Sequence, residues 1–534
     1  MTPVGHTAPV GHPTPVGHTT SLTDALRKTV SRGCLLLSFV LVGFVVLGAG
    51  LPRTAFATEP DVRFDVDKRD ADKRDADELG DTDAALTAAE RGFRYLTEVP
   101  LLTRDFDQTT FDNVWRVWPE RLRRTAELSD LATRRQMAFE RYGLTVRPGH
   151  DGEATDPGKP LQYVIDDAGR WTMNCFSCHG GSVYGEPHPG SPNNRFALQT
   201  MTEELRATKS LLGKPPSRMD LGSLFVPLGT THGTTNAVVF GMGLMARRDG
   251  QLNLLPPSFQ QFVHHDMDAP PWWHFSKRPN LYIDGFAQKG HRGLMQFTLI
   301  PENGPEVFRQ REEDFRDVYA YIESVQPPPY QESIDDDLAE RGRAVFADHC
   351  ARCHGTYGSG TFDSGRGDET HYPNLRIPID DIGTDPVRLT ALSVEGRRKY
   401  ASSWFAHAGE DDVQETTVDP DGYVAPPLDG VWASAPYFHN GSVPTLWHVL
   451  HPDDRPVVWR RTEIGLDASR VGLTIEAYNA VPDAIGDVKT ADDAALRRQF
   501  FDTRRFGKSA GGHRYPDDLT EPEKRAVLEY LKTL

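Results

Sequence analysis

Two short stretches decide how this sequence is interpreted: Cys175-Phe176-Ser177-Cys178-His179 and Cys350-Ala351-Arg352-Cys353-His354. Both follow the pattern C-x-x-C-H, which is the attachment site of c-type haem. The spacing reflects the chemistry, because two thiols add across the two porphyrin vinyl groups and the adjacent histidine becomes the proximal iron ligand. The sequence therefore predicts two covalently bound haem c groups, each held by two cysteines and one histidine of its motif.

The number of cysteines supports this interpretation. The chain has five cysteines, and four of them lie in the two motifs. The alternatives for such cysteines are a disulfide, a redox dithiol or a zinc knuckle. A zinc site built from all four thiols would leave both adjacent histidines without a role, so haem attachment is favoured.

The N-terminal region has the pattern of an export signal. Basic residues precede an uncharged apolar run over 34–51, and Ala55-Phe56-Ala57 follows it. This order is typical of a secretory signal peptide that is cleaved after Ala57. We therefore expect an exported protein, periplasmic or secreted, in agreement with the attachment of c-type haem outside the cytoplasm. Because the run is long enough to cross a bilayer, a retained N-terminal membrane anchor is the alternative.

Two low-complexity segments flank this signal. Residues 1–20 repeat Pro-Val-Gly-His, ending at His6, His12 and His18. They are interpreted as a disordered extension, with a metal-binding histidine tract as the alternative. Residues 58–88 are a charged linker that contains a repeated Asp-Lys-Arg-Asp-Ala unit and few apolar residues to bury.

The rest of the chain is divided into two regions. We expect an N-terminal haem domain over 89–329 and a C-terminal cytochrome c domain over 330–534, separated at Pro327-Pro328-Pro329. The predicted fold class is mainly α with long loops, with two cytochrome c-like haem domains. Residues 1–57 are assigned to the disordered extension and the signal peptide.

Different secondary structure is predicted around the two motifs. Apolar residues at helical spacing predict a helix over 337–349 that leads directly into Cys350. A capping box at Thr520 begins a last helix, and Gly342 would allow these two terminal helices to cross closely. No long helix is expected before Cys175, because residues 163–165 are extended and 166–169 form a turn. Other helices are predicted over 90–95, 112–126, 203–212 and 312–324.

The overall charge limits the partners. The chain of 534 residues has a formal net charge of −17. Binding to nucleic acid or to an anionic membrane surface needs a basic face, so neither is expected. Contact with a membrane is expected only if the N-terminal segment is retained.

The sequence resembles a known superfamily. The segment 428–446, LDGVWASAPYFHNGSVPTL, together with two C-x-x-C-H motifs in an exported chain, is similar to the bacterial dihaem cytochrome c peroxidase and MauG superfamily. The lead residues of this segment and a Gly-His pair at 512–513 resemble the dihaem rubber oxygenase (RoxA-like) branch most. The resemblance covers roughly 90–534, and it is strongest after 340.

One departure from that superfamily concerns the second haem. Its peroxidase members use a methionine after this segment as a distal ligand, but residues 296–534 contain no methionine. A bis-histidine site is therefore expected, with His354 proximal and His513 distal. His439, in the resembling segment, is the alternative distal ligand. The other downstream candidates are His371, His407, His448 and His451.

Candidates around the first haem are less specific. Trp272, Trp273, Glu302 and Glu306 are the candidate catalytic residues, with the tryptophans near a haem edge and the glutamates as acid/base groups for O–O cleavage. Core packing for the tryptophans and plain solvation for the glutamates are the alternatives. The cluster His264, His265, His274 and His291 offers candidates for a distal ligand of the first haem, with a surface or core role for each as the alternative. A structural calcium, known in the superfamily, is not readable from any spacing.

The resemblance implies an exported dihaem oxidoreductase. One haem would react with peroxide or dioxygen, and the other would relay or store electrons. The partners would be a small-molecule oxidant and an electron donor or organic substrate. The alternatives are a non-catalytic dihaem electron carrier, with both irons six-coordinate, and an oxygenase that acts on an apolar substrate.

Overall fold

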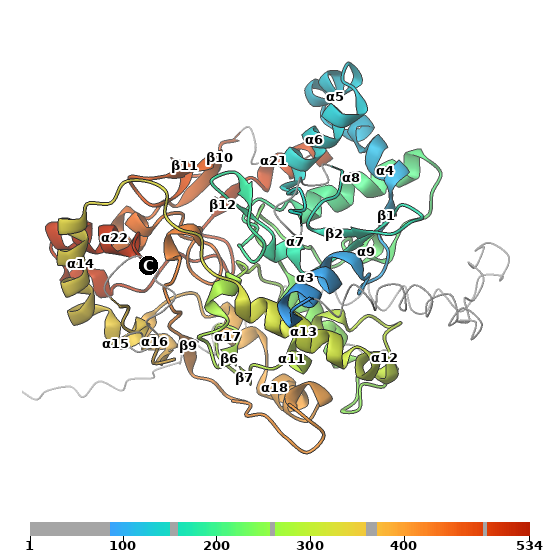
Figure 1. Cartoon of the computed structure of the whole chain (residues 1–534). Helices are drawn as coiled ribbons and strands as arrows, with labels where there is room; N and C mark the ends of the chain where they lie inside the picture. Colours follow the sequence, from blue (N-terminus) through green and yellow to red (C-terminus); the bar gives the residue numbers. More distant parts are fainter. Residues whose placement is uncertain (1–85, 150–157, 257–261, 359–370, 484–488) are drawn as a thin grey trace, which may run out of the picture. The chain divides into compact units, whose positions relative to one another are not determined.

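The structure is a computed structural model that describes residues 86–149, 158–256, 262–358, 371–483 and 489–534 (Figure 1). The described residues belong to one compact unit that begins at Asp83. The predicted extension, signal peptide and most of the charged linker lie outside the described residues. Within the described ranges, no helix has both the length and the apolar character that crossing a membrane requires.

Helices and long connections dominate, as predicted, and most of the strands have only two to four residues. The helices before the second motif not discussed below are α9 (Arg218–Gly222), α10 (Ala237–Ala246), η3 (Trp272–His274), α11 (His291–Met295), η4 (Gln296–Thr298) and α12 (Pro305–Gln310). Two small hairpins pair β4 (Ser182–Val183) with β5 (Glu186–Pro187) and β6 (Asn280–Leu281) with β7 (Ala287–Gln288). The division into two haem domains at 329/330 stays a prediction.

A pair of helices opens and closes the first region. Helix α3 (Ala88–Glu98) packs along α13 (Glu312–Ser324), which has the predicted bounds. At Gly92 a Cβ atom would lie 2.1 Å from the Asp317 carbonyl oxygen, so only glycine permits this approach. A salt bridge of 2.7 Å from Arg91 Nε to Asp317 Oδ2 adds a polar contact at the crossing.

The first motif follows a small antiparallel sheet. The strand order is β1 (Phe106–Asp107), β3 (Arg170–Met173), β2 (Tyr163–Ile165), with Phe106 opposite Trp171 and Tyr163 opposite Met173. Strand β3 leads through one residue into Cys175, so the expectation that no long helix precedes this motif is confirmed. Helices α6 (Leu131–Tyr142), α7 (Phe176–His179) and α8 (Leu198–Leu211) complete this part.

The single helix predicted over 112–126 is wrong. The chain forms α4 (Gln108–Asn113), η2 (Val114–Val117) and α5 (Glu120–Glu127) instead. The break falls at Trp118, whose backbone is extended with φ −67° and ψ 160°. Pro119 explains the break, because the proline ring disfavours helical geometry in the residue before it.

The second motif is held by two crossing helices, as predicted. Helix α14 (Asp336–His349) runs into Cys350 and α15 (Ala351–His354), and it lies beside the last helix α22 (Glu521–Leu531) (Figure 1). A Cβ atom at Gly342 would lie 1.9 Å from the Ala526 carbonyl oxygen. The close crossing therefore depends on glycine at this position.

The remaining C-terminal elements lie partly beside this helix pair and partly against the first region. A three-stranded antiparallel sheet has the order β11 (Gly472–Tyr478), β10 (Val458–Asp467), β12 (Phe500–Asp502), and the sequence analysis did not predict it. Strand β8 (Arg376–Pro378) pairs with β9 (Gly422–Val424). The helices are α16 (Ile379–Ile382), α17 (Val387–Ala391), α18 (Val394–Ala401), η5 (Trp404–Ala406), η6 (Val431–Ala433), α19 (Leu446–Leu450), η7 (Pro452–Asp454), α21 (Ala491–Arg497) and η8 (Tyr515–Asp518). Of these, α19 contacts α22, whereas α18 contacts α10 and η5 contacts α11 of the first region.

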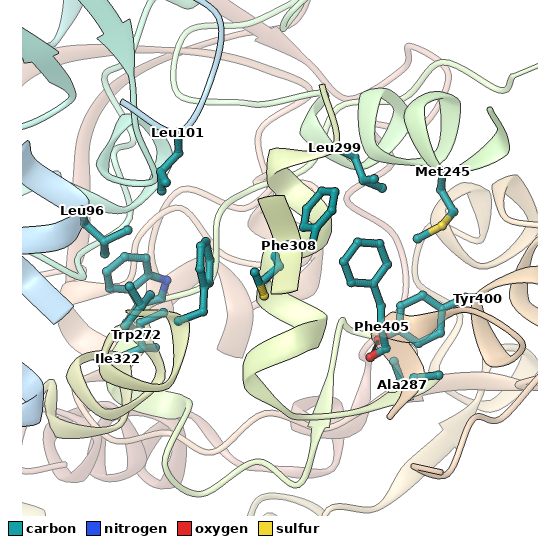
Figure 2. Packing of buried hydrophobic residues seen from close by; sticks show 14 of the residues in the cluster. Leu96, Leu101, Met245, Trp272, Ala287, Leu299, Phe308, Ile322, Tyr400 and Phe405 are labelled. Carbon is teal, nitrogen blue, oxygen red and sulfur yellow. Dashed lines mark hydrogen bonds between the residues drawn. The ribbon is translucent and has the colours of Figure 1, made fainter. Parts of the chain in front are cut away.

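Separate apolar cores support the two motifs. Figure 2 shows the core that includes Leu96, Trp272, Phe308 and Phe405, and Cys175 packs against this cluster. A second core, which includes Phe346 of α14, packs against Cys350. Each motif is thus fixed by its own cluster of buried side chains. Phe405 and Tyr400 belong to the first core although they follow the second motif in the chain, so the C-terminal half also contributes to the first site.

Candidate functional site

The two motifs open onto one cavity of about 1100 Å³. Pockets for a single small ligand have volumes of roughly 300–1,000 Å³. All six motif residues that the sequence predicts as haem-binding line this cavity: Cys175, Cys178, His179, Cys350, Cys353 and His354. The four thiols are free, so the disulfide alternative is not adopted in the structure.

Asn174 positions the first motif at the end of β3. Its Nδ2 donates to the Leu161 carbonyl oxygen at 3.0 Å, and its Oδ1 accepts from the Phe176 backbone N–H at 3.0 Å. The side chain thereby ties the start of α7 to the loop before β2. Burial raises the pKa of the Cys175 thiol to about 12, so the group is a neutral thiol at physiological pH.

The His179 ring is oriented by a backbone carbonyl. Its Nδ1 lies 3.0 Å from the carbonyl oxygen of Pro270. Because a carbonyl oxygen only accepts, Nδ1 carries the proton and Nε2 keeps its lone pair for a metal. Burial lowers the pKa of His179 to about 4, which keeps the ring neutral. Trp272 stacks on the ring at a centroid distance of 4.8 Å.

His354 repeats this arrangement in the second motif. Its Nδ1 donates to the carbonyl oxygen of Pro426 at 2.9 Å, and burial lowers its pKa. Sequence reasoning missed both proline carbonyls. A signal was present, because Ala-Pro-Pro occurs at 269–271 and again at 425–427, with the accepting proline in the middle each time.

His513 faces His354 across the second site. The two ring centroids are 6.2 Å apart. Two imidazoles that bind one metal through about 2.0 Å bonds on opposite sides have centroids about 6 Å apart, so the spacing suits an iron between the rings. His513 Nδ1 is buried without a hydrogen-bond partner, and the ring lines the cavity.

The backbone before His513 makes this placement possible. Gly512 has φ +76°, and a Cβ there would lie 2.2 Å from the Gly383 carbonyl carbon. His513 itself has φ +48°, and its backbone N–H donates to the Ile382 carbonyl oxygen at 2.6 Å. A larger residue at position 512 would separate the two loops and move the His513 ring.

Arg455 fixes the same loop from the other side. Its Nη1 donates to the carbonyl oxygens of Ala510 and Gly512, both at 2.7 Å, and its Nη2 donates to the His513 carbonyl at 3.4 Å. The guanidinium also lies 4.9 Å from the centroid of Phe438, which packs near His513. Arg455 is therefore a positioning residue that the sequence analysis did not identify.

His439 also lines the cavity but is placed differently. Its ring packs against Tyr423 at 4.6 Å, and its carbonyl oxygen accepts from the Asp268 N–H at 2.9 Å. Its Nε2 is buried without a partner, and burial lowers its pKa to about 3. Within the described residues, the ring contacts of His354 include His513 and not His439.

The other predicted distal candidates of the second haem lie outside the cavity wall. His407 Nδ1 donates to the Ser403 carbonyl at 3.0 Å, and His448 Nδ1 contacts Thr445 Oγ1 at 2.7 Å. His451 stacks on Trp447 and forms a 3.0 Å contact with Glu521. His371 is exposed and forms a bridge with Thr356.

The first site has a different wall. Cys178 contacts Thr235, just before α10, and the wall continues with apolar side chains of α10, α11 and η4. These residues include Val238, Phe240, Leu244, Leu294 and Phe297. Among the residues that the structure describes, the ring that packs on His179 is Trp272, and no second histidine ring does.

The histidine cluster predicted near the first haem is dispersed. His264 Nε2 contacts the Pro227 carbonyl at 3.0 Å, and His291 Nε2 lies 2.9 Å from Glu312. His265 Nδ1 donates to the Val263 carbonyl at 2.9 Å. His274 alone of the four lines the cavity, and its Nε2 donates to the Asp429 carbonyl at 2.8 Å.

The predicted catalytic residues fall into two groups. Trp272 and Trp273 are buried, and Trp272 lines the cavity beside His179. Glu302 forms a 2.6 Å salt bridge with Arg218, and Glu306 is 79% exposed; neither lines the cavity. Within the described ranges, no group of three or more His, Cys, Asp or Glu side chains is arranged to hold a metal ion, so no residue is assigned to a structural calcium.

One family model matches the chain. It is described as RoxA-like, cytochrome c-like, and it matches residues 422–460. This segment contains His439. It also contains Pro426, whose carbonyl oxygen accepts a hydrogen bond from His354 Nδ1. The match therefore falls on the part of the chain that surrounds the second motif.

Three curated proteins are similar over parts of their length. Uncharacterized protein y4iM of Sinorhizobium fredii is 32% identical over 253 residues, which cover 40% of this chain and 52% of that protein. Uncharacterized protein y4iJ of the same organism is 29% identical over 256 residues, covering 38% and 39%. The cbb3-type cytochrome c oxidase subunit CcoP of Cereibacter sphaeroides is 33% identical over 84 residues, covering 16% and 27%. The chain spans about half of these relatives or less.

The matches and the geometry agree on the chemistry. The family model and the oxidase subunit support a cytochrome c family, with covalently bound haem c and a role in haem electron transfer. The residues fit that group, because each motif presents two free thiols and one histidine whose Nδ1 is engaged and whose Nε2 is available.

Proposed function

We propose that this protein is an exported dihaem c-type oxidoreductase in which the first haem reacts with peroxide or dioxygen and the second relays or stores electrons. The observation that carries the proposal is the asymmetry of the shared cavity. His354 has a second imidazole 6.2 Å away, whereas His179 has Trp272 on its ring and an apolar wall around its motif. An open iron position binds small oxidants, and a filled one favours electron transfer.

The chain's own residues have distinct tasks in this scheme. Haem supplies the redox chemistry when bound. His179 and His354 would ligate iron through Nε2, and their proline carbonyl partners hold the tautomer and the ring angle. His513 would close the sixth position of the second iron. Val238, Phe240 and Leu244 would exclude bulk water from the first site.

The spectrum of the purified protein tests this proposal. We expect a pyridine haemochrome of c type with two haems per chain, and a ferric spectrum with one low-spin and one high-spin haem. Carbon monoxide should bind about one reduced haem per chain. Two low-spin haems that are inert to peroxide and carbon monoxide would contradict the proposal and favour a non-catalytic dihaem carrier.

A second candidate is an oxygenase that acts on an apolar substrate. Its support is a set of exposed apolar side chains in the segments next to the first-site wall: Leu221, Leu224, Phe225, Leu254, Leu255, Phe262 and Phe297. Phe297 also lines the cavity. If this candidate is right, an apolar substrate should perturb the high-spin signal, and Phe297→Asp should abolish that effect without changing carbon monoxide binding.

Export and partners complete the proposal. The mature chain should begin near Thr58, and N-terminal sequencing of exported material tests this. An intact apolar segment recovered in the membrane fraction would instead support the anchor. The proposed partners are a small-molecule oxidant and an electron donor or organic substrate, with no nucleic acid.

A further inference from the structure

Arg278 is a buried cation on the wall of the haem cavity. It follows η3 at the end of the segment that carries Pro270 and Trp272. Its Nη2 donates to the Tyr282 carbonyl oxygen, while its Nε is buried without a hydrogen-bond partner. Burial also lowers the pKa of the Arg278 guanidinium below its usual value, although the group remains charged. The protein therefore places a charged group in the wall with part of its bonding capacity unused.

Among the described residues, no carboxylate forms a salt bridge with Arg278. The nearby acidic residue Asp284 is already paired with Arg397 at 2.8 Å and with Arg388 at 3.3 Å. A buried charge without a counter-ion is costly, so the fold is expected to gain an anion from whatever fills the cavity.

Arg376 presents a second cation on the same wall. Its Nε donates to the Asp284 carbonyl oxygen at 3.1 Å, and its Nη2 donates to Thr417 Oγ1 at 3.3 Å. Both acceptors are neutral. The segments of the two arginines are joined by a 3.1 Å hydrogen bond from Asn374 Nδ2 to Asn280 Oδ1. Because one segment continues from the first site and the other pairs with the strand before Pro426, the two cations lie where the haem sites meet.

We propose that Arg278, with Arg376 beside it, binds the propionate carboxylates of haem where the two sites meet. The propionates are the anionic groups of the porphyrin periphery, and a guanidinium matches a carboxylate with a pair of parallel hydrogen bonds. The inference rests on the proposed binding of haem in the shared cavity. It adds a function for Arg278: the cation raises the midpoint potential of the haem whose propionate it binds, because it disfavours the more positively charged ferric state.

Substitution of Arg278 tests the inference in the full-length protein. Arg278→Gln removes the charge, Arg278→Lys keeps it, and Arg218→Gln is the matched control. Arg218 also lines the cavity, but it is 60% exposed and already paired with Glu302. Haem content is measured first by pyridine haemochrome, and spectroelectrochemical titration then gives the potential of each haem.

Arg278→Gln should lower the potential of one haem by about 59 mV, which corresponds to a tenfold change in its one-electron equilibrium. Arg278→Lys should keep the midpoint potentials close to those of the wild type, and Arg218→Gln should leave the potentials of both haems unchanged. The spin state of the haem that shifts identifies which propionate is bound. Unchanged potentials in Arg278→Gln protein that carries its normal haem would overturn the inference.

Two further measurements distinguish failure of this inference from misfolding of the variant and from failure of the proposed function. If Arg278→Gln does not fold, the resonance Raman propionate-bending mode is compared between the wild type and Arg278→Lys. A shift of that mode supports the inference, and an unchanged mode contradicts it. A wild-type protein with only one haem would contradict the proposed function, while the effect of Arg278 could still be measured on the haem that is present.

Discussion

The two C-x-x-C-H motifs begin from the same chemistry and end in different surroundings. In each, the histidine Nδ1 donates to a proline carbonyl, so the proximal side is built alike. The first motif follows a strand and is held by Asn174, whereas the second follows a helix that crosses α22 at Gly342. His513 faces His354, and no corresponding histidine contacts His179 within the described residues. The comparison teaches that the five-residue motif specifies the thiols and the histidine, while residues distant in the chain determine what faces that histidine.

The largest expected effect comes from removing the distal histidine. His513→Ala should convert the second haem from low spin to high spin, because no other imidazole packs against His354 in the described structure. Both haems should remain covalently bound, and carbon monoxide binding should rise from about one to about two per chain. Electron paramagnetic resonance and visible spectra of the ferric protein measure this change.

His439→Ala is the matched control for that experiment. His439 lines the same cavity but packs on Tyr423, so its loss should leave the low-spin signal in place. If His513→Ala preserves the low-spin signal and His439→Ala removes it, His439 and not His513 is the distal ligand of the second haem.

The next largest effect concerns a buried ion pair that ties the two sites together. Asp266 Oδ2 lies 2.9 Å from Lys508 Nζ, and both side chains are almost fully buried. Asp266 precedes the Pro270 segment and Lys508 precedes His513. Asp266→Asn should lower the free energy of unfolding by about 3–5 kcal/mol, because it leaves a buried cation unpaired. Urea unfolding at pH 7 measures this, and adding Lys508→Met should restore much of the loss.

The same pair predicts a pH dependence. Burial raises the pKa of Asp266, but Lys508 and the hydroxyls of Thr230 and Thr234 outweigh it and lower this pKa to about 2. A depressed carboxyl pKa contributes stability that is complete above the unfolded value near 4 and is lost as the pH falls toward 2. We expect about 2 kcal/mol of acid-labile stability that is missing in Asp266→Asn. Equal acid sensitivity of both proteins would contradict this assignment.

A smaller effect is expected at the helix crossing that supports the second motif. Gly342→Ala should cost about 1–3 kcal/mol, because the new Cβ would collide with the Ala526 carbonyl at the helix crossing. Gly465→Ala is the control, since a Cβ there would meet no atom within 4 Å. Thermal unfolding followed at the low-spin haem should report the loss, and a wild-type melting temperature in Gly342→Ala would exclude a tight crossing.

An effect of similar size is expected at the corresponding support of the first motif. Asn174→Ala removes two hydrogen bonds and leaves the Leu161 carbonyl and the Phe176 N–H without these partners, at a cost of about 1–3 kcal/mol. Asn174→Asp keeps the acceptor for Phe176 but places a buried carboxylate against the Leu161 carbonyl oxygen, so it should cost at least as much as Asn174→Ala. During denaturation of Asn174→Ala, the signal of the high-spin haem should change before that of the low-spin haem. The reverse order would contradict the interpretation that each motif is held by its own set of contacts.

The sequence by itself determined the features that depend on local chemistry. The two motifs specify thiols and an adjacent histidine within five residues each, and helical periodicity placed α13, α14 and the last helix nearly to the residue. Gly342 was predicted at a close crossing because glycine alone lets two helix backbones approach. The continuous helix over 112–126 failed because Pro119 outweighed the apolar pattern, and the sheet of β10, β11 and β12 was missed.

Only the tertiary structure decided what faces each motif. The partners of His179 and His354 are backbone carbonyls 91 and 72 residues away, and a carbonyl leaves no trace in residue type beyond the repeated Ala-Pro-Pro. The sequence offered His513 and His439 as alternatives, and the path of the loop after Gly512 places the His513 ring 6.2 Å from His354. Such contacts depend on how distant segments pack together, because ring geometry in space is not a function of spacing along the chain.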